Sequence, residues 1–176
     1  PLTAPCPCKK PAKSHRIRNV FTDFVKRVKK ILYIDLDNVL VDFSSALTYF
    51  SPEILKSFEG RLDEVPEIFA KMEPVQGAVA AFNTLAGRFD TYVLSTAPWN
   101  NPSAWSDKLE WVKTHLGKPA YKRLILTHHK ELNRGHFLVD DREKNGASEF
   151  TGELILFRSA RFPDWTAVTK YLLERV

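Results

Sequence analysis

The chain has 176 residues, of which 44% are hydrophobic and 27% charged, a composition typical of a globular protein with one core. No apolar run approaches the ~20 residues that a helix needs to cross a bilayer, so no membrane span is expected. The only cysteines are Cys6 and Cys8, which excludes a fold held together by several disulfides. Without a second Cys or His pair, their spacing is a weak metal signal.

The formal net charge of +5 is concentrated near the amino-terminal end. Residues 1–22 contain no acidic side chain and five basic ones: Lys9, Lys10, Lys13, Arg16 and Arg18. We interpret residues 1–16 as a basic flexible arm, and nucleic-acid binding is not expected of it, because charge runs are usually only solvated. The expected location is cytoplasmic. Organellar targeting stays open, since transit segments are also rich in Arg and poor in acids.

Periodic apolar patterns follow the arm in a regular order. Residues 17–28 place apolar side chains at helical spacing, which predicts an amphipathic helix that packs on the domain. Five short apolar runs are typical of strands in a parallel sheet: 31–34, 92–94, 124–126, 137–139 and 154–157. Helical patterns between and after them cover 76–86 (closed by Gly87), 104–116 (closed by Gly117) and 164–175 (started by Pro163 and Asp164).

This alternation of strands and helices predicts an α/β fold, a three-layer sandwich with a parallel sheet and helices on both faces. One stretch after the first strand breaks the alternation, with helical patterns at 43–50, 52–58 and 63–71. We interpret it as a small inserted helical cap. The predicted organisation is an arm (1–16), a catalytic core (17–42 and 75–176) and a cap segment (43–74).

Polar side chains follow the ends of four predicted strands, where parallel sheets bind their ligands. In chain order they are Asp35 and Asp37, Ser95 and Thr96, Lys130, and Asp140 and Asp141. Clustered carboxylates repel one another unless a cation is present, and oxygen ligands of this kind suit Mg²⁺. A lysine beside them fits a site that also binds a phosphate dianion. Each of these polar residues alone is common in a turn after a strand, but their combined order along the chain predicts a phosphate and magnesium site.

The first two carboxylates suit a two-step phosphoryl transfer. Asp35 would attack phosphorus in line and form an acyl phosphate. Asp37 would protonate the leaving oxygen and then activate the water that hydrolyses the intermediate.

The segment from Ile34 to Leu40 (I-D-L-D-N-V-L) resembles the first motif of haloacid dehalogenase (HAD) superfamily phosphatases. Leu94-Ser95-Thr96 resembles the second motif, Lys130 the third, and Leu138-Val139-Asp140-Asp141 the fourth. More closely, the chain is similar to the 5′(3′)-deoxyribonucleotidase family, through D-L-D-N-V-L-V-D-F at 35–43, M-E-P-V-Q-G-A-V at 72–79 and the segment 111–130. The resemblance covers most of 31–146, with the cap as the exception.

The resemblance implies a role for each matching residue. Asp35 would be nucleophile and metal ligand, and Asp37 acid/base and metal ligand through its backbone carbonyl. Thr96 and Lys130 would hold phosphate, Asp141 would bind the metal with Asp140 in support, and Phe43 would contact the nucleotide. The chain departs from the family pattern in its short cap and at three places: Asn38 for Gly, Ala97 for a phosphate-contacting Ser, and His128-His129 for an Arg-Asp pair.

The expected function is Mg²⁺-dependent hydrolysis of a phosphomonoester, a 5′-(deoxy)ribonucleoside monophosphate, through an aspartyl-phosphate. One alternative is a HAD phosphatase for another small phosphate ester, such as a sugar phosphate. The other is a non-catalytic HAD-fold binding protein that works through the basic arm, which the complete set of catalytic groups disfavours. The oligomeric state is not indicated by the sequence.

Overall fold

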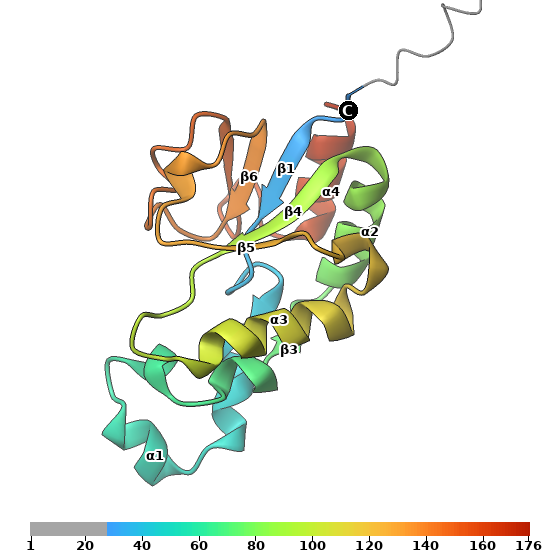
Figure 1. Cartoon of the computed structure of the whole chain (residues 1–176). Helices are drawn as coiled ribbons and strands as arrows, with labels where there is room; N and C mark the ends of the chain where they lie inside the picture. Colours follow the sequence, from blue (N-terminus) through green and yellow to red (C-terminus); the bar gives the residue numbers. More distant parts are fainter. Residues whose placement is uncertain (1–27) are drawn as a thin grey trace, which may run out of the picture.

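A five-stranded parallel sheet forms the centre of the computed structural model, which describes residues 28–176 (Figure 1). Its strand order is β5-β4-β1-β6-β7, with neighbouring strands parallel throughout. The strands are β1 (Ile31–Ile34), β4 (Asp90–Ser95), β5 (Leu124–Leu126), β6 (Phe137–Asp140) and β7 (Glu153–Leu156). The predicted α/β fold and its five strands are confirmed. Because the strands are parallel, their carboxyl ends meet at one edge of the sheet.

The two faces of the sheet are covered differently. Helices α2 (Ala78–Arg88), α3 (Ser103–His115) and α4 (Trp165–Leu173) contribute to one large core cluster, together with strand residues such as Ile34 and Val139. The opposite strand side chains belong to a second cluster with Ala147 and Phe150, from the connection between β6 and β7. None of the α-helices between residues 28 and 176 contributes to this second cluster, so the expectation of helices on both faces of the sheet is not met, and a loop covers the second face instead.

The predicted helix ends are only partly correct. Asp164 caps α4 by accepting a hydrogen bond from the Ala167 amide at 2.9 Å, and Gly117 follows α3 with a positive φ of 57°, both as expected. The prediction that Gly87 closes α2 is wrong, because the helix continues to Arg88. It ends where Phe89 becomes extended and buries its ring, so core packing rather than glycine sets this boundary.

Two short antiparallel strands join the ends of the cap segment: β2 (Val41–Asp42) comes directly before it, and β3 (Glu73–Pro74) forms its last two residues. The segment contains the 3₁₀ helices η2 (Phe43–Tyr49), η3 (Leu62–Glu64) and η4 (Ile68–Lys71) and the α-helix α1 (Pro52–Ser57). The predicted single helix over 63–71 is wrong. Pro66 lacks an N–H and disfavours helical backbone at the residue before it, and Val65 is accordingly extended.

The cap segment shares its apolar interior with the rest of the molecule. Ile68, Phe69 and Met72 belong to the large core cluster, and the Trp111 indole N–H donates to the Met72 carbonyl at 2.8 Å. The segment therefore rests on α3, below the carboxyl edge of the sheet as drawn in Figure 1.

The basic arm and, except for Val28, the predicted helix over 17–28 lie outside the described residues. Between residues 28 and 176, no helix has the length and apolar character required to cross a membrane.

Candidate active site

A cavity of about 600 Å³ lies at the carboxyl ends of the strands and is bordered by the cap segment. Its walls include the predicted site residues Asp35, Asp37, Phe43, Thr96 and Lys130. Five neighbours that the sequence had not singled out for a role also line it: Asp63, Glu64, Trp99, Asn100 and Arg142. The topology thus brings the ends of four strands and part of the cap to one space.

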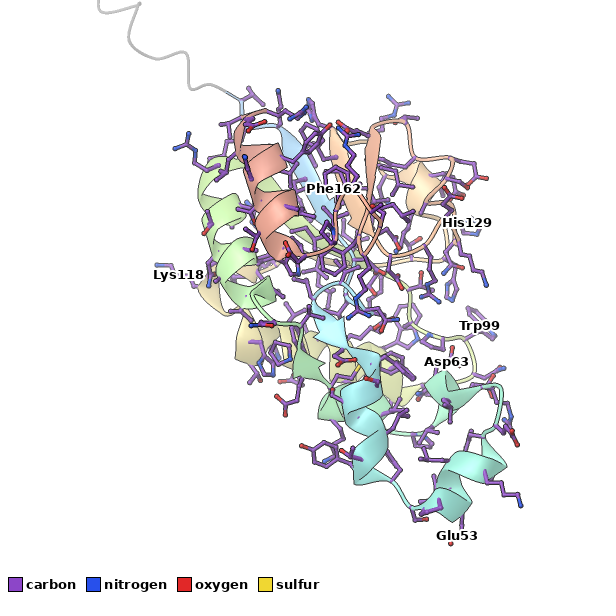
Figure 2. The ribbon with its side chains drawn as sticks, turned by 180° about the vertical axis from the view of Figure 1, so that it is seen from behind. Glu53, Asp63, Trp99, Lys118, His129 and Phe162 are labelled. Atoms are coloured by element: carbon purple, nitrogen blue, oxygen red, sulfur yellow. The ribbon has the colours of Figure 1, made fainter. Side chains whose placement is uncertain are left out.

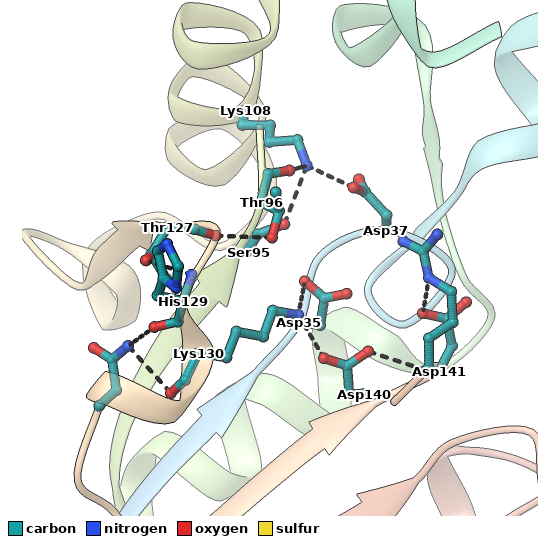
Figure 3. Close-up of polar contacts among 12 residues, drawn as sticks. Asp35, Asp37, Ser95, Thr96, Lys108, Thr127, His129, Lys130, Asp140 and Asp141 are labelled. Carbon is teal, nitrogen blue, oxygen red and sulfur yellow. Dashed lines mark hydrogen bonds and ion pairs between the residues drawn. The ribbon is translucent and has the colours of Figure 1, made fainter. Parts of the chain in front are cut away.

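A buried lysine joins two carboxylates in the floor of this cavity (Figure 3). The Lys130 ammonium donates to Asp140 Oδ2 at 2.5 Å and lies 3.1 Å from Asp35 Oδ1. Asp35 directly follows β1, and its amide donates to the Val139 carbonyl at 2.9 Å. Lys130 sits at the start of the short η6 helix (Lys130–Leu132), with its own amide bonded to the Asn145 carbonyl.

The ionisation of these groups reflects their burial and their charges. Burial raises the pKa of Asp140 to about 7, and the Asp35 charge adds to this effect while Lys130 opposes it. Burial lowers the pKa of Lys130, but Asp35 and Asp140 outweigh burial, so that its pKa is raised and it stays charged. The lysine therefore offsets much, but not all, of the repulsion among the carboxylates.

The acidic residues fit a divalent cation. Asp35, Asp140 and Asp141 each offer an oxygen atom, and these atoms all lie within 4.8 Å of one another. Asp35 Oδ1 and Asp141 Oδ1 are buried and accept no hydrogen bond, although they form ion pairs with Lys130 at 3.1 Å and with Arg142 at 3.4 Å. Burial raises the pKa of Asp141 as well. These ion pairs compensate the buried oxygens only in part, and a hard cation such as Mg²⁺ would compensate them further.

Asp37 points away from that cluster. Its Oδ2 accepts a hydrogen bond from the Lys108 ammonium at 2.6 Å, while its Oδ1 is buried without a donor. Burial raises the pKa of Asp37, against the opposing charge of Lys108. The sequence had not indicated Lys108, because a lysine within an amphipathic helix pattern is usually solvated.

The residues after β1 and β4 adopt the turns that the site requires. Asn38, which replaces the family's Gly, has a φ of 57°, a left-handed conformation that Asn tolerates well. The Thr96 hydroxyl donates to the Thr127 carbonyl at 2.8 Å, so it would have to exchange this bond to donate to a phosphate. Ala97 is fully buried and belongs to the core.

Two aromatic pairs lie along the cavity. The Phe43 and Phe69 rings meet edge to face at 6.1 Å between centroids, and the Trp99 and His128 rings do so at 5.9 Å. Phe50 and Phe58, which also belong to the cap, pack against the core cluster and do not line the cavity. Trp99 remains 81% exposed, and no periodic pattern indicated it because it lies in a loop.

The loop after β4 is tied to the cap segment by side-chain amides. Asn100 donates to Glu64 Oε1 at 2.8 Å, and the buried Asn101 donates to the carbonyls of Asp63 and Val65 at 2.9 and 3.0 Å. Figure 2 shows Trp99 and Asp63 close to each other, where these two loops meet. The loop that begins at the predicted phosphate site is thereby held against the cap.

The sequence of the chain is similar to those of known nucleotidases. Residues 46–166 match the family model described as 5′ nucleotidase, deoxy (pyrimidine), cytosolic type C protein. A Vibrio phage KVP40 protein, provisionally named a 5′(3′)-deoxyribonucleotidase, is 58% identical over 147 residues, covering 84% of this chain and 86% of its own. The 5′(3′)-deoxyribonucleotidase of Bacillus subtilis is 25% identical over 174 residues, covering 83% of this chain and all of its own.

A solved structure supports the fold independently. The provisionally assigned HAD-hydrolase YfnB from Bacillus subtilis, bound to magnesium, matches with a TM-score of 0.52 and 11% identity, covering 78% of this chain and 90% of that one. At this identity the likeness concerns the fold alone. Family model, relatives and fold agree with the resemblance seen in the motifs: the chain has a HAD-like fold, belongs to the 5′(3′)-deoxyribonucleotidase family and is a nucleotide phosphatase.

Proposed function

We propose that the chain hydrolyses 5′-(deoxy)ribonucleoside monophosphates through an aspartyl-phosphate on Asp35, with Mg²⁺ as cofactor. The observation that carries the proposal is the placing of Asp35 in a cavity that also contains a second carboxylate, a buried lysine and aromatic rings. The family membership supports a nucleotide as substrate.

The reaction follows from the residues around the phosphoryl group. An Asp35 carboxylate oxygen bonds to phosphorus while the ester P–O bond breaks, and Asp37 gives its proton to the departing oxygen. A water molecule then attacks phosphorus and gives a proton to Asp37, the bond between phosphorus and Asp35 breaks, and phosphate leaves. Both carboxylates return to their starting states.

Charge compensation accompanies both steps. Asp35 and Asp141, with the backbone carbonyl of Asp37, would hold Mg²⁺, which would neutralise charge on the phosphoryl oxygens. Lys130 keeps its proton and would balance the remaining negative charge of the phosphate. Asp140 would hold the Lys130 ammonium in place, since it accepts the shortest contact of that group.

The cap segment (43–74), which shares its apolar interior with the core, would select the leaving group. Phe43 starts this segment immediately after the catalytic loop and lines the cavity, so its ring offers a face for the nucleoside.

We also propose a cytoplasmic location, because the matching family is described as a cytosolic type. Fractionation of cells that express the protein would test that location.

A substrate panel tests the function. Purified protein should release phosphate from nucleoside monophosphates faster than from sugar phosphates such as ribose 5-phosphate, and the activity should require Mg²⁺. Equal rates for all esters would contradict a preference for nucleotides and indicate a general HAD phosphatase. Full activity in excess chelator would contradict the metal assignment.

A further inference from the structure

Lys108 is a fully buried lysine in the middle of α3, a position where a charged side chain needs compensation. Its ammonium donates to three oxygens: Asp37 Oδ2 at 2.6 Å, Ser95 Oγ at 3.1 Å and the Thr96 carbonyl at 2.6 Å. An ammonium has three protons, so every donor is satisfied. The same group lies 4.5 Å from the centroid of the Phe69 ring.

The contacts of Lys108 connect four parts of the molecule. They join α3 to the loop after β1, to the end of β4 and to the cap residue Phe69. Apolar residues of similar volume often replace a buried ion pair without loss of stability. Stability alone therefore does not explain a lysine here, whereas its contact with Asp37 suggests a role in catalysis.

We propose that Lys108 is a positioning residue that fixes the Asp37 carboxylate for proton transfer. The inference rests on the proposed function, in which Asp37 is the acid and base. Lys108 holds Oδ2, which leaves Oδ1 without a hydrogen-bond donor. Oδ1 is thus the oxygen on which a proton is carried, and the lysine prevents the carboxylate from rotating out of reach.

If Lys108 positions Asp37, its replacement should affect two substrates differently, which loss of a purely structural lysine would not do. A poor leaving group such as phenoxide needs a proton from Asp37 as the P–O bond breaks, but 4-nitrophenoxide departs largely without one. The two aryl phosphates are similar in size, and kcat/KM reports phosphoryl transfer to Asp35 for both. Loss of positioning should therefore affect phenyl phosphate much more than 4-nitrophenyl phosphate.

The experiment compares Lys108→Met with the parent on both esters. We expect kcat/KM for phenyl phosphate to fall about tenfold to a hundredfold, a part of the 10²–10⁴ that general acid catalysis supplies. For 4-nitrophenyl phosphate we expect less than about a threefold decrease on the same reasoning. Lys113→Met is the matched control, because Lys113 is an exposed lysine of the same helix. It should leave both values unchanged.

Lys108→Met leaves the Asp37 carboxylate buried without its partner, which can destabilise the fold. A double variant that also removes the carboxylate is therefore compared. Asp37→Asn/Lys108→Met removes both charges, and its kcat/KM for phenyl phosphate should equal that of Asp37→Asn alone within about threefold, given the usual scatter of coupled sites. If the loss of kcat/KM in the double variant is the product of the losses in the two single variants, Lys108 does not act through Asp37. The same holds if Lys108→Met lowers kcat/KM equally for both esters. If Asp37→Asn itself retains parental activity, the acid/base assignment fails instead.

Discussion

Lys130 and the carboxylates around it are stabilised only as a group. Taken out of water, a lone ammonium or carboxylate is strongly disfavoured, yet Lys130, Asp35 and Asp140 are all nearly fully buried. Their ion pairs compensate one another, and the remaining negative charge leaves room for a cation. A site arranged in this way fits the proposed binding of a metal ion and a phosphate.

Replacing Lys130 by Met should remove the fixed counter-charge of the phosphate. We expect kcat/KM for a nucleoside monophosphate to fall by roughly a hundredfold or more, since one preorganised contact contributes about 3 kcal/mol. Steady-state kinetics at saturating Mg²⁺ provide the measurement. Lys144→Met is the control, because Lys144 also lines the cavity but makes none of the ion pairs found among residues 28–176. Unchanged kinetics for Lys130→Met would place the phosphate elsewhere.

The sequence identified the residues that follow strand ends, because there residue type and position together imply chemistry. Asp35, Thr96 and Asp140 are examples, since each comes at the end of a short apolar run. Lys108 was not identifiable, because its partners come from three other segments and a helical pattern says nothing about them. Trp99 was missed for a similar reason: a loop has no periodicity that indicates where its side chains point.

Among the elements, the loop between β4 and α3 connects the phosphate site to the cap. Asn101 is buried and fixes this loop on the cap carbonyls, while Trp99, two residues earlier, remains exposed at the cavity wall. A large aromatic face held in this position can receive a nucleobase, in the cavity that Phe43 and Phe69 also line.

Replacing Trp99 by Ala should therefore impair nucleotides selectively. Base stacking contributes ~1–3 kcal/mol, so kcat/KM for a deoxynucleoside monophosphate should fall about 5-fold to 150-fold. Deoxyribose 5-phosphate has the same sugar and phosphate but no base, and its kcat/KM should stay within about twofold on this reasoning. Trp105→Ala, at a half-exposed tryptophan of α3 outside the cavity, is the control. Equal losses for both substrates would show that Trp99 supports the loop and not the base.

Element types were predictable where the hydrophobic pattern was long or strictly apolar, and less so elsewhere. The strands and the helices α2, α3 and α4 meet that condition. The cap does not, because Pro66 interrupts its pattern and short 3₁₀ turns replace a helix. The two-residue strands β2 and β3 are too short to produce any alternation, although their pairing closes the cap segment at both ends.

At the scale of the whole molecule, the acidic cluster should link metal binding to stability. The site lies between the sheet edge and the cap, and its three carboxylates repel one another in the absence of a cation. An ion that binds only the folded state raises the free energy of unfolding by mass action.

Mg²⁺ should consequently raise the melting temperature of the protein. At about 100 times its Kd the gain is roughly 2.7 kcal/mol, which corresponds to about 5–10 °C for a chain of this size. Thermal unfolding with and without chelator measures it, independently of activity. Asp141→Asn should reduce the shift strongly, whereas Glu149→Gln, at an exposed acid outside the cluster, should leave it intact. An unchanged melting temperature over all Mg²⁺ concentrations would contradict a site formed by these residues.

A covalent intermediate on Asp35 can be trapped by rapid quenching. The parent enzyme and Asp37→Asn are mixed with a deoxynucleoside monophosphate and Mg²⁺, quenched in acid within one turnover, and reduced with borohydride, which converts an acyl phosphate to an alcohol. We expect homoserine at position 35 in the peptide mass spectrum, and none in Asp35→Asn. Phosphate release with no reduced residue in either protein, or reduction at a different carboxylate, would contradict it.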